Sequence, residues 1–184
     1  MKIIEFESKL YPNKLRQINN APKKLYVEGN IENLNTHCLS VIGSRNCTEY
    51  GEKWCKIFVK ELINYDLTIV SGMAKGIDAI AHSSAINVRG KTIAVLPSGF
   101  NNIYPRENIN LYNKIIENGG TVITEYSPKE KVSSNKFLER NRIVSGLSIA
   151  TLVVEAAYRS GTTVTAKLAR SQNRDVFCIP RKFR

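Results

Sequence analysis

Short apolar runs alternate with longer amphipathic segments along most of the chain. The runs are rich in Val and Ile and several end in Gly, Ser or Pro, a composition that predicts β-strands. We expect strands at residues 25–27, 38–43, 67–72, 92–96, 121–125, 150–156 and 176–180. Segments of helical length lie between them, at residues 50–65, 77–88, 108–118, 137–147 and 163–172. This alternation indicates an α/β protein.

The hydrophobic periodicity of these segments refines the fold. In residues 50–65, Trp54, Ile57, Phe58 and Leu62 recur at steps of three and four, which predicts a helix with one buried side. Several strands are apolar on both faces, as strands are in a parallel sheet covered by helices. With right-handed crossovers, the pattern predicts a doubly wound, mainly parallel, Rossmann-like sheet with three layers, α/β/α.

The chain is long enough for one well-filled core. It has 184 residues, of which 42% are hydrophobic, and no shift in composition divides it. We therefore expect a single domain over residues 1–184, in which residues 1–30 form a polar, proline-containing lead-in.

Charge and cysteine content narrow the classes of function. The sequence has 27 Lys and Arg against 16 Asp and Glu, a net charge of +11 that favours a polyanionic partner. Four cysteines without a CxxC pair, and a start without a signal peptide, favour a reduced, cytoplasmic protein. Only two histidines and no long apolar run are present, so we expect no metal, no cofactor and no membrane span.

Small and polar residues follow four of the predicted strands. Ligands of a doubly wound sheet lie outside the carboxyl ends of its strands, where small residues permit close approach to the backbone. Cations and helix N-termini at such loops favour phosphate. The loops contain residues 97–99 and the candidate phosphate-binding residues Gly43, Ser44, Arg45, Ser71, Gly72, Lys75, Ser160, Gly161 and Thr162.

Two arginines lie in the predicted helix at residues 137–147. At helical spacing Phe137, Arg140, Val144 and Leu147 share one face, so Arg140 continues the apolar stripe toward a crevice. A partly desolvated guanidinium is costly unless a carboxylate or phosphate meets it. By itself, the segment is equally consistent with an anion site and with a structural ion pair, and the strand-end loops favour the anion site. Candidate carboxylate partners are Glu125, Glu139 and Glu155.

Several common nucleotide and catalytic motifs are absent. GSRNCTEYG is not GxGxxG, SGMAKGID lacks the Lys-Ser/Thr of a P-loop, and no GxSxG elbow occurs. Asp78 and His82 are four residues apart on a predicted helix, but a helix-start Asp and a buried His are the commoner explanation. Dinucleotide chemistry and ATP hydrolysis are therefore not supported.

Taken together, the motifs resemble the DNA-processing protein A (DprA, or Smf) family. The resemblance rests on their order and spacing over most of the chain, rather than on any one of them. The motifs are YPNKLRQI, APKKLYVEG, VIGSRNCTEYG, IVSGMAKGIDAIAH, GKTIAVLPSGFNNIYPREN, GGTVITEY, FLERNRIVSGLS, VVEAAYRSGTTVTAKLA and RDVFCIP.

The resemblance implies a non-enzymatic protein that binds single-stranded DNA and helps to load the recombinase RecA during natural transformation. It places the site at Gly43, Ser44, Arg45, Ser71, Gly72, Lys75, Phe137, Arg140, Asn141 and Arg142. Phe137 either offers a face for base stacking or belongs to the core, and Asn141 would hydrogen-bond sugar, phosphate or a base. We expect Glu125 and Glu155 to orient the arginines rather than to act as acids or bases.

The sequence also departs from the family. The family usually continues beyond its closing strand, whereas this sequence ends shortly after Pro180, so we expect a truncation there. Homodimer formation and contact with RecA are left open for that reason. The alternative function is a small-nucleotide-binding or nucleotide-hydrolysing protein, but the PGGxGT pattern of related hydrolases is missing around Ser160. A protein that only interacts with partners is a third alternative.

Overall fold

A single mixed sheet carries the fold in the computed structural model, which describes residues 1–158 and 160–180. In this part of the chain the strand order is β1-β2-β6-β5-β4-β3-β7-β8. The truncation expected after residue 180 lies outside the described residues. The strands are β1 (Lys2–Glu5), β2 (Lys24–Gly29), β3 (Cys38–Gly43), β4 (Thr68–Ser71), β5 (Thr92–Val95), β6 (Thr121–Thr124), β7 (Ala150–Glu155) and β8 (Asp175–Cys178).

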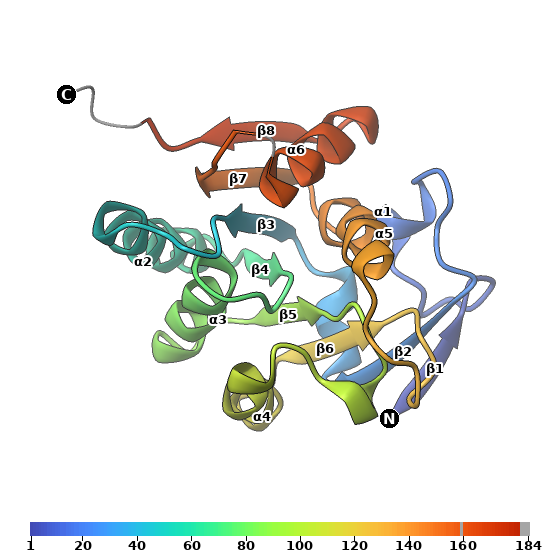
Figure 1. Ribbon diagram of the computed structural model, residues 1–184. Helices are drawn as coiled ribbons and strands as arrows, with labels where there is room; N and C mark the ends of the chain where they lie inside the picture. Colours follow the sequence, from blue (N-terminus) through green and yellow to red (C-terminus); the bar gives the residue numbers. More distant parts are fainter. Residues whose placement is uncertain (159, 181–184) are drawn as a thin grey trace.

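Helices cover both faces of the sheet (Figure 1). One face packs against α2 (Glu49–Asn64), α3 (Ile77–Asn87) and α4 (Ile109–Glu117). The other packs against α1 (Asn13–Arg16), α5 (Ser134–Gly146) and α6 (Gly161–Ser171). Short 3-10 turns lie at η1 (Ile31–Asn35), η2 (Phe100–Asn102) and η3 (Arg106–Asn108). The predicted doubly wound, three-layer Rossmann-like fold is confirmed.

The order of the strands creates a switch point in the sheet. The chain steps from β3 through β4 and β5 to β6, and then returns to place β7 on the other side of β3. The strands from β6 to β8 are all parallel, while β2 pairs antiparallel with both β6 and β1. Helices leave the carboxyl ends of β3 and β7 toward opposite faces, which opens a crevice between them.

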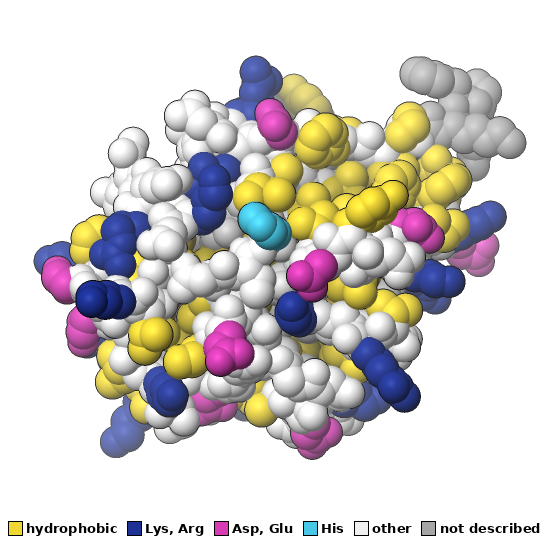
Figure 2. Space-filling model, turned by 180° about the vertical axis from the view of Figure 1, so that it is seen from behind, with side chains coloured by type: hydrophobic (Ala, Val, Ile, Leu, Met, Phe, Trp, Pro, Cys, Tyr) yellow, Lys and Arg dark blue, Asp and Glu magenta, His cyan; other side chains and the backbone are white. Residues whose placement is uncertain are grey.

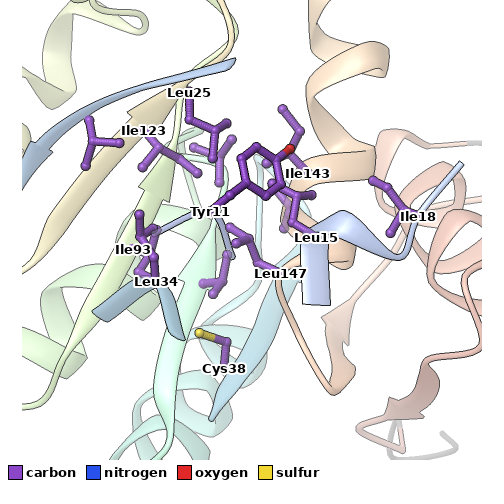
Figure 3. Close-up of a cluster of buried hydrophobic side chains, with 14 of the residues drawn as sticks. Tyr11, Leu15, Ile18, Leu25, Leu34, Cys38, Ile93, Ile123, Ile143 and Leu147 are labelled. Atoms are coloured by element: carbon purple, nitrogen blue, oxygen red, sulfur yellow. The ribbon is translucent and has the colours of Figure 1, made fainter. Parts of the chain in front are cut away.

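The first 30 residues are more than a lead-in. They contribute β1, which the apolar pattern did not predict because only Ile4 of its four residues is buried. Tyr11 and Leu15 are fully buried and lie against Ile143 of α5 and against Leu147, which follows this helix, in the largest core cluster (Figure 3). The N-terminal segment therefore supports the helix that carries the two candidate arginines.

Replacing Leu15 by Ala tests this role of the N-terminal segment. Loss of a buried Leu leaves a cavity, so we expect the free energy of unfolding to fall by about 2–5 kcal/mol, as measured by urea denaturation. Leu10→Ala is the matched control, because Leu10 is exposed and its loss leaves no cavity. Similar small losses for both variants would contradict the packing of α1 against α5.

Candidate functional site

A cavity of about 640 Å³ lies at the switch point of the sheet. Its walls are the turn after β3, the turn after β4, the first turn of α3 and the N-terminal halves of α5 and α6. The two turns are packed tightly together. The amide of Ile77 donates a hydrogen bond to the carbonyl of Ser44 at 3.1 Å, and a Cβ added to Gly76 would lie 2.3 Å from that oxygen.

Most of the residues singled out in the sequence line this cavity. They come from four separate parts of the chain that the parallel strands bring to one edge. The cavity-lining candidates are Gly43, Ser44, Arg45, Gly72, Phe137, Arg140, Asn141, Ser160, Gly161 and Thr162. The further polar residues of the lining, which the sequence analysis did not assign to the site, are Asn46, Asp78, Ser134 and Thr165.

Arg140 forms the buried end of the site. Its side chain is 4% exposed, and its guanidinium donates to the backbone carbonyls of Gly72 and Val95, at the ends of β4 and β5. Its Nε donates to Oδ1 of Asn141 at 3.2 Å. The sequence offered Glu125, Glu139 and Glu155 as partners of the arginines, and none of them accepts a hydrogen bond from Arg140 in the described residues. The Arg140 guanidinium donates to backbone carbonyls instead, because α5 places it at the carboxyl ends of β4 and β5.

Asp78 supplies the nearby negative charge. It lies in the first turn of α3, is 8% exposed, and accepts a hydrogen bond from the amide of Ala74 at 3.3 Å. Burial raises the pKa of its carboxyl, and the charge of Arg140 opposes that shift. Burial in turn lowers the pKa of Arg140 to about 10, with Asp78 acting in the opposite direction. The Arg140 guanidinium therefore stays charged at neutral pH and is compensated from within the protein.

Arg142 has a different position from the one predicted. Its guanidinium forms two hydrogen bonds with the Glu125 carboxylate, at 2.7 and 2.6 Å, and its Nε donates to the carbonyl of Asn20 at 3.0 Å. These contacts tie α5 to the end of β6 and to the N-terminal segment. The predicted pairing of an arginine with Glu125 is thus present, but it removes Arg142 from the cavity, because a step of two residues turns about 200° around the helix axis and so leaves the face that carries Arg140.

Three other predicted residues also lie outside the cavity wall. The Ser71 hydroxyl is buried and donates to the carbonyl of Val41 at 2.7 Å, which links β4 to β3. Lys75 points outward and pairs with Glu107 at 2.6 Å. The Glu155 carboxylate accepts from the amide and hydroxyl of Thr48, both at 3.0 Å, and so fixes the start of α2 rather than an arginine. The loop at residues 97–99 does not line the cavity either.

Arg45 and Phe137 lie together on the rim. The guanidinium of Arg45 is 5.1 Å from the centre of the Phe137 ring, and the edge of that ring meets Tyr104 at a centroid distance of 5.4 Å. Phe137 is only partly buried, so it is a rim residue rather than a core residue. Arg45 is exposed and has no carboxylate partner in the described part of the chain. Among the described residues, Arg45 is therefore the cation of the site without a carboxylate partner.

The start of α6 forms the opposite wall. Ser160 is its N-cap but its hydroxyl makes no capping bond, and no acidic residue occupies the first turn. The Ser160 hydroxyl is buried without a partner in the described residues. Thr162, at 8% exposure, faces the same cavity. Unpaired amide groups and the helix dipole make this wall attractive to an anion.

The face seen from behind carries dispersed positive charge (Figure 2). Figure 2 shows the molecule from behind, where Lys and Arg side chains stand singly and several lie beside Asp or Glu. On the described part of that face the positive charge forms no continuous patch.

Within residues 1–158 and 160–180, no cluster of His, Cys, Asp and Glu is suited to a metal ion. None of the described helices is long and apolar enough to cross a membrane.

Comparison with known proteins gives a consistent result. The sequence model of the DNA recombination-mediator protein A family matches residues 2–184. Protein Smf of Escherichia coli is 43% identical over 178 residues, which are 97% of this chain and 48% of that protein. The DNA processing protein DprA of Streptococcus pneumoniae is 42% identical over 170 residues, 92% of this chain and 60% of that protein.

Solved structures point to the same family as the sequence comparison. The X-ray structure of DprA from Streptococcus pneumoniae superimposes with a TM-score of 0.93 at 38% identity, covering 99% of this chain and 64% of that one. A Helicobacter pylori DNA processing protein A, described for its single-stranded DNA binding mode, gives 0.89 at 30% identity and covers 100% and 83%. A molybdenum cofactor binding protein from Rippkaea orientalis, at 17% identity and a TM-score of 0.56, shares the fold alone.

The chain spans about half the length of the relatives that it matches in sequence. The match nevertheless runs from β1 to the end of the sequence and includes every wall of the cavity. The chain belongs to the DNA recombination-mediator protein A family.

Proposed function

We propose that this chain binds single-stranded DNA through the cavity at the switch point of the sheet. The observation that carries the proposal is the arrangement of Arg45, an exposed cation for which the described residues offer no carboxylate partner, facing the open N-terminus of α6. The two walls are suited to two consecutive phosphates of one strand. The Helicobacter pylori relative, described as binding single-stranded DNA, supports the same ligand.

The rim favours a single strand over a duplex. Phe137 presents a partly buried ring beside Arg45, and an unpaired base can stack on such a ring, whereas a paired base has its faces covered by its neighbours. The net charge of +11 adds long-range attraction for the strand. Phosphate contacts carry no sequence information, so this part of the binding is independent of sequence.

We further propose that the site performs no catalysis. Its acid, Asp78, is held by a loop amide and lies beside Arg140, and His82 is fully buried outside the cavity. The Nδ1 atom of His82 lies 2.7 Å from the Thr92 hydroxyl. Burial lowers the pKa of His82 to about 3, which leaves it neutral and unsuited to proton transfer at neutral pH.

We also propose two protein partners, which the family resemblance implies. They are a RecA-type recombinase and a second copy of the chain. In the described part of the chain β8 is an edge strand of the sheet, and Phe177 on it is 56% exposed. An exposed edge with an aromatic side chain is a surface that protein partners cover. Sedimentation of the chain alone tests for a dimer. Sedimentation of the chain with the recombinase tests for a complex of the two proteins.

The affinity for DNA should depend steeply on salt. If about three phosphates are neutralised on a single strand, the affinity for an oligothymidylate falls about 20-fold between about 50 and 200 mM salt. Fluorescence anisotropy at a series of salt concentrations measures this slope. A flat salt dependence would show that phosphate neutralisation is not the basis of binding, and a mononucleotide that bound as tightly as the oligonucleotide would favour a small-nucleotide site.

Arg45 should contribute more to affinity than cations outside the cavity. We expect Arg45→Ala to weaken oligothymidylate binding by about tenfold, because a charge-assisted contact to phosphate is lost. The matched control is Arg170→Ala, which removes an exposed arginine of α6 that does not line the cavity. Equal losses for the two variants would indicate diffuse attraction instead of a site.

Arg140 should behave as a structural residue in the same assays. Arg140→Ala leaves Asp78 buried without its counter-charge and two strand-end carbonyls without a donor, so we expect the free energy of unfolding to fall by about 3–5 kcal/mol. Arg45→Ala, on the exposed rim, provides the comparison and should change the unfolding energy little. An Arg140→Ala protein of unchanged stability would refute this assignment.

A further inference from the structure

The loop that carries Arg45 is short and is bound at both ends by one residue. It follows β3, runs from Ser44 to Thr48 and leads into α2. At its start, the Ser44 amide donates to the backbone carbonyl of Glu155 at 2.8 Å. At its end, the amide and the hydroxyl of Thr48 both donate to Oε2 of the Glu155 side chain, each at 3.0 Å. Glu155, at the end of β7, therefore holds the loop at its start and at its end.

The pairing of two strands brings Glu155 to this place. β3 and β7 are parallel neighbours, and their register shifts between Ile42 and Gly43, so that Gly43 pairs with Glu155. An irregularity of this kind changes the direction of the chain that follows it. β3 leads to the cavity wall that carries Arg45, and β7 leads to the wall formed by α6. Glu155 thus fastens the first wall to the strand that precedes the second.

The contact between Glu155 and Thr48 is closely packed. The Thr48 hydroxyl donates to Glu155 and accepts from the amide of Gly51 at 3.2 Å, so it also caps α2. The dipole of α2 favours a carboxylate at this end of the helix. A Cβ added to Gly51 would lie 2.2 Å from Oε2 of Glu155, so a side chain at this position would displace the carboxylate.

Arg45 depends on the loop for its position. Its guanidinium is exposed on the rim of the cavity, 5.1 Å from the centre of the Phe137 ring. No carboxylate among the described residues forms an ion pair with it, so the loop backbone and the Phe137 ring hold it in place. A cation that becomes ordered only on meeting phosphate binds more weakly, since ordering a long side chain and its loop costs free energy.

We propose that Glu155 is the positioning residue for Arg45 and acts through the loop from Ser44 to Thr48, without contact with the DNA. This proposal rests on the proposed function, in which Arg45 meets a phosphate of single-stranded DNA. Glu155 itself does not line the cavity. Its negative charge repels phosphate, so removal of the charge alone strengthens DNA binding, whereas loss of the contact with Thr48 weakens it.

Two substitutions of Glu155 separate these opposite effects. Glu155→Ala and Glu155→Gln remove the same charge, but the side-chain carbonyl of Gln still accepts from the amide and hydroxyl of Thr48. We expect Glu155→Ala to weaken binding of an oligothymidylate about fivefold in fluorescence anisotropy, because the loop is then ordered only when DNA binds. Glu155→Gln keeps the contact and should bind more tightly than Glu155→Ala by about the same factor. Equal affinities of the two variants overturn the proposal.

A double-mutant cycle shows whether the effect passes through Arg45. In a protein that already carries Arg45→Ala, the loop has no cation to present, so Glu155→Ala should lower the affinity by less than about twofold. Residues that act independently have additive effects. The same loss in both backgrounds would therefore refute the role assigned to Glu155, because it would show that the residue supports the site in another way.

Hydrogen exchange in the DNA-free protein tests the loop itself. Glu155→Ala removes the acceptor of the Thr48 amide and should speed the exchange of this amide, whereas Glu155→Gln should not. Gly51→Ala is a second variant, which remains informative if Glu155→Ala does not fold. Its Cβ displaces the carboxylate, so it should reproduce both the faster exchange and the weaker DNA binding. Slow exchange and full affinity in Gly51→Ala would contradict the proposal.

The outcomes separate this inference from the function on which it rests. If the unmodified protein binds oligothymidylate and Glu155→Ala binds it as tightly as Glu155→Gln, the positioning role fails and single-stranded DNA binding stands. If the unmodified protein binds no oligothymidylate, the proposed function fails, and the role of Glu155 in it fails as well.

Discussion

The buried guanidinium of Arg140 is the contact on which the site depends. It joins α5 to the carboxyl ends of two neighbouring strands by donating to the carbonyls of Gly72 and Val95. A cation with 4% exposure is stable in this place only because those carbonyls, Asn141 and the nearby charge of Asp78 compensate it. Gly72 has no side chain for the same reason, since a Cβ there would lie 2.5 Å from the guanidinium.

This arrangement divides the positive charges of the site into two kinds. Arg140 and Arg142 are satisfied by protein groups and hold the framework together. Arg45 and the first turn of α6 remain unsatisfied in the described residues and face the cavity. Binding an anion there completes contacts that folding leaves open. It is thus the smaller, exposed set of donors, rather than the buried arginines, that suits phosphate.

The framework extends well beyond the cavity. Tyr11 and Leu15 pack under α5, and the Arg142 guanidinium reaches the carbonyl of Asn20, so the N-terminal segment helps to hold the helix in register with the sheet. The turns after β3 and β4 pack against each other, with Gly76 at a φ of +71°, and this contact fixes the cavity wall that carries Ser44 and Arg45. A site built from four distant segments is therefore held on rigid elements.

Hydrophobic periodicity and the position of small residues after strands were enough to predict the alternation of strands and helices, the doubly wound sheet and the strand-end edge at which the cavity lies. The sequence by itself also singled out Arg45, Phe137 and the start of α6, which line the cavity. Which of the described arginines lacks a protein partner could be seen only in the folded chain, because hydrogen-bond partners such as the Gly72 carbonyl and Glu125 come from distant segments. Packing between elements, which local sequence patterns do not encode, likewise set the inclusion of β1 in the sheet, the outward position of Lys75 and the place of Asp78 in the cavity lining.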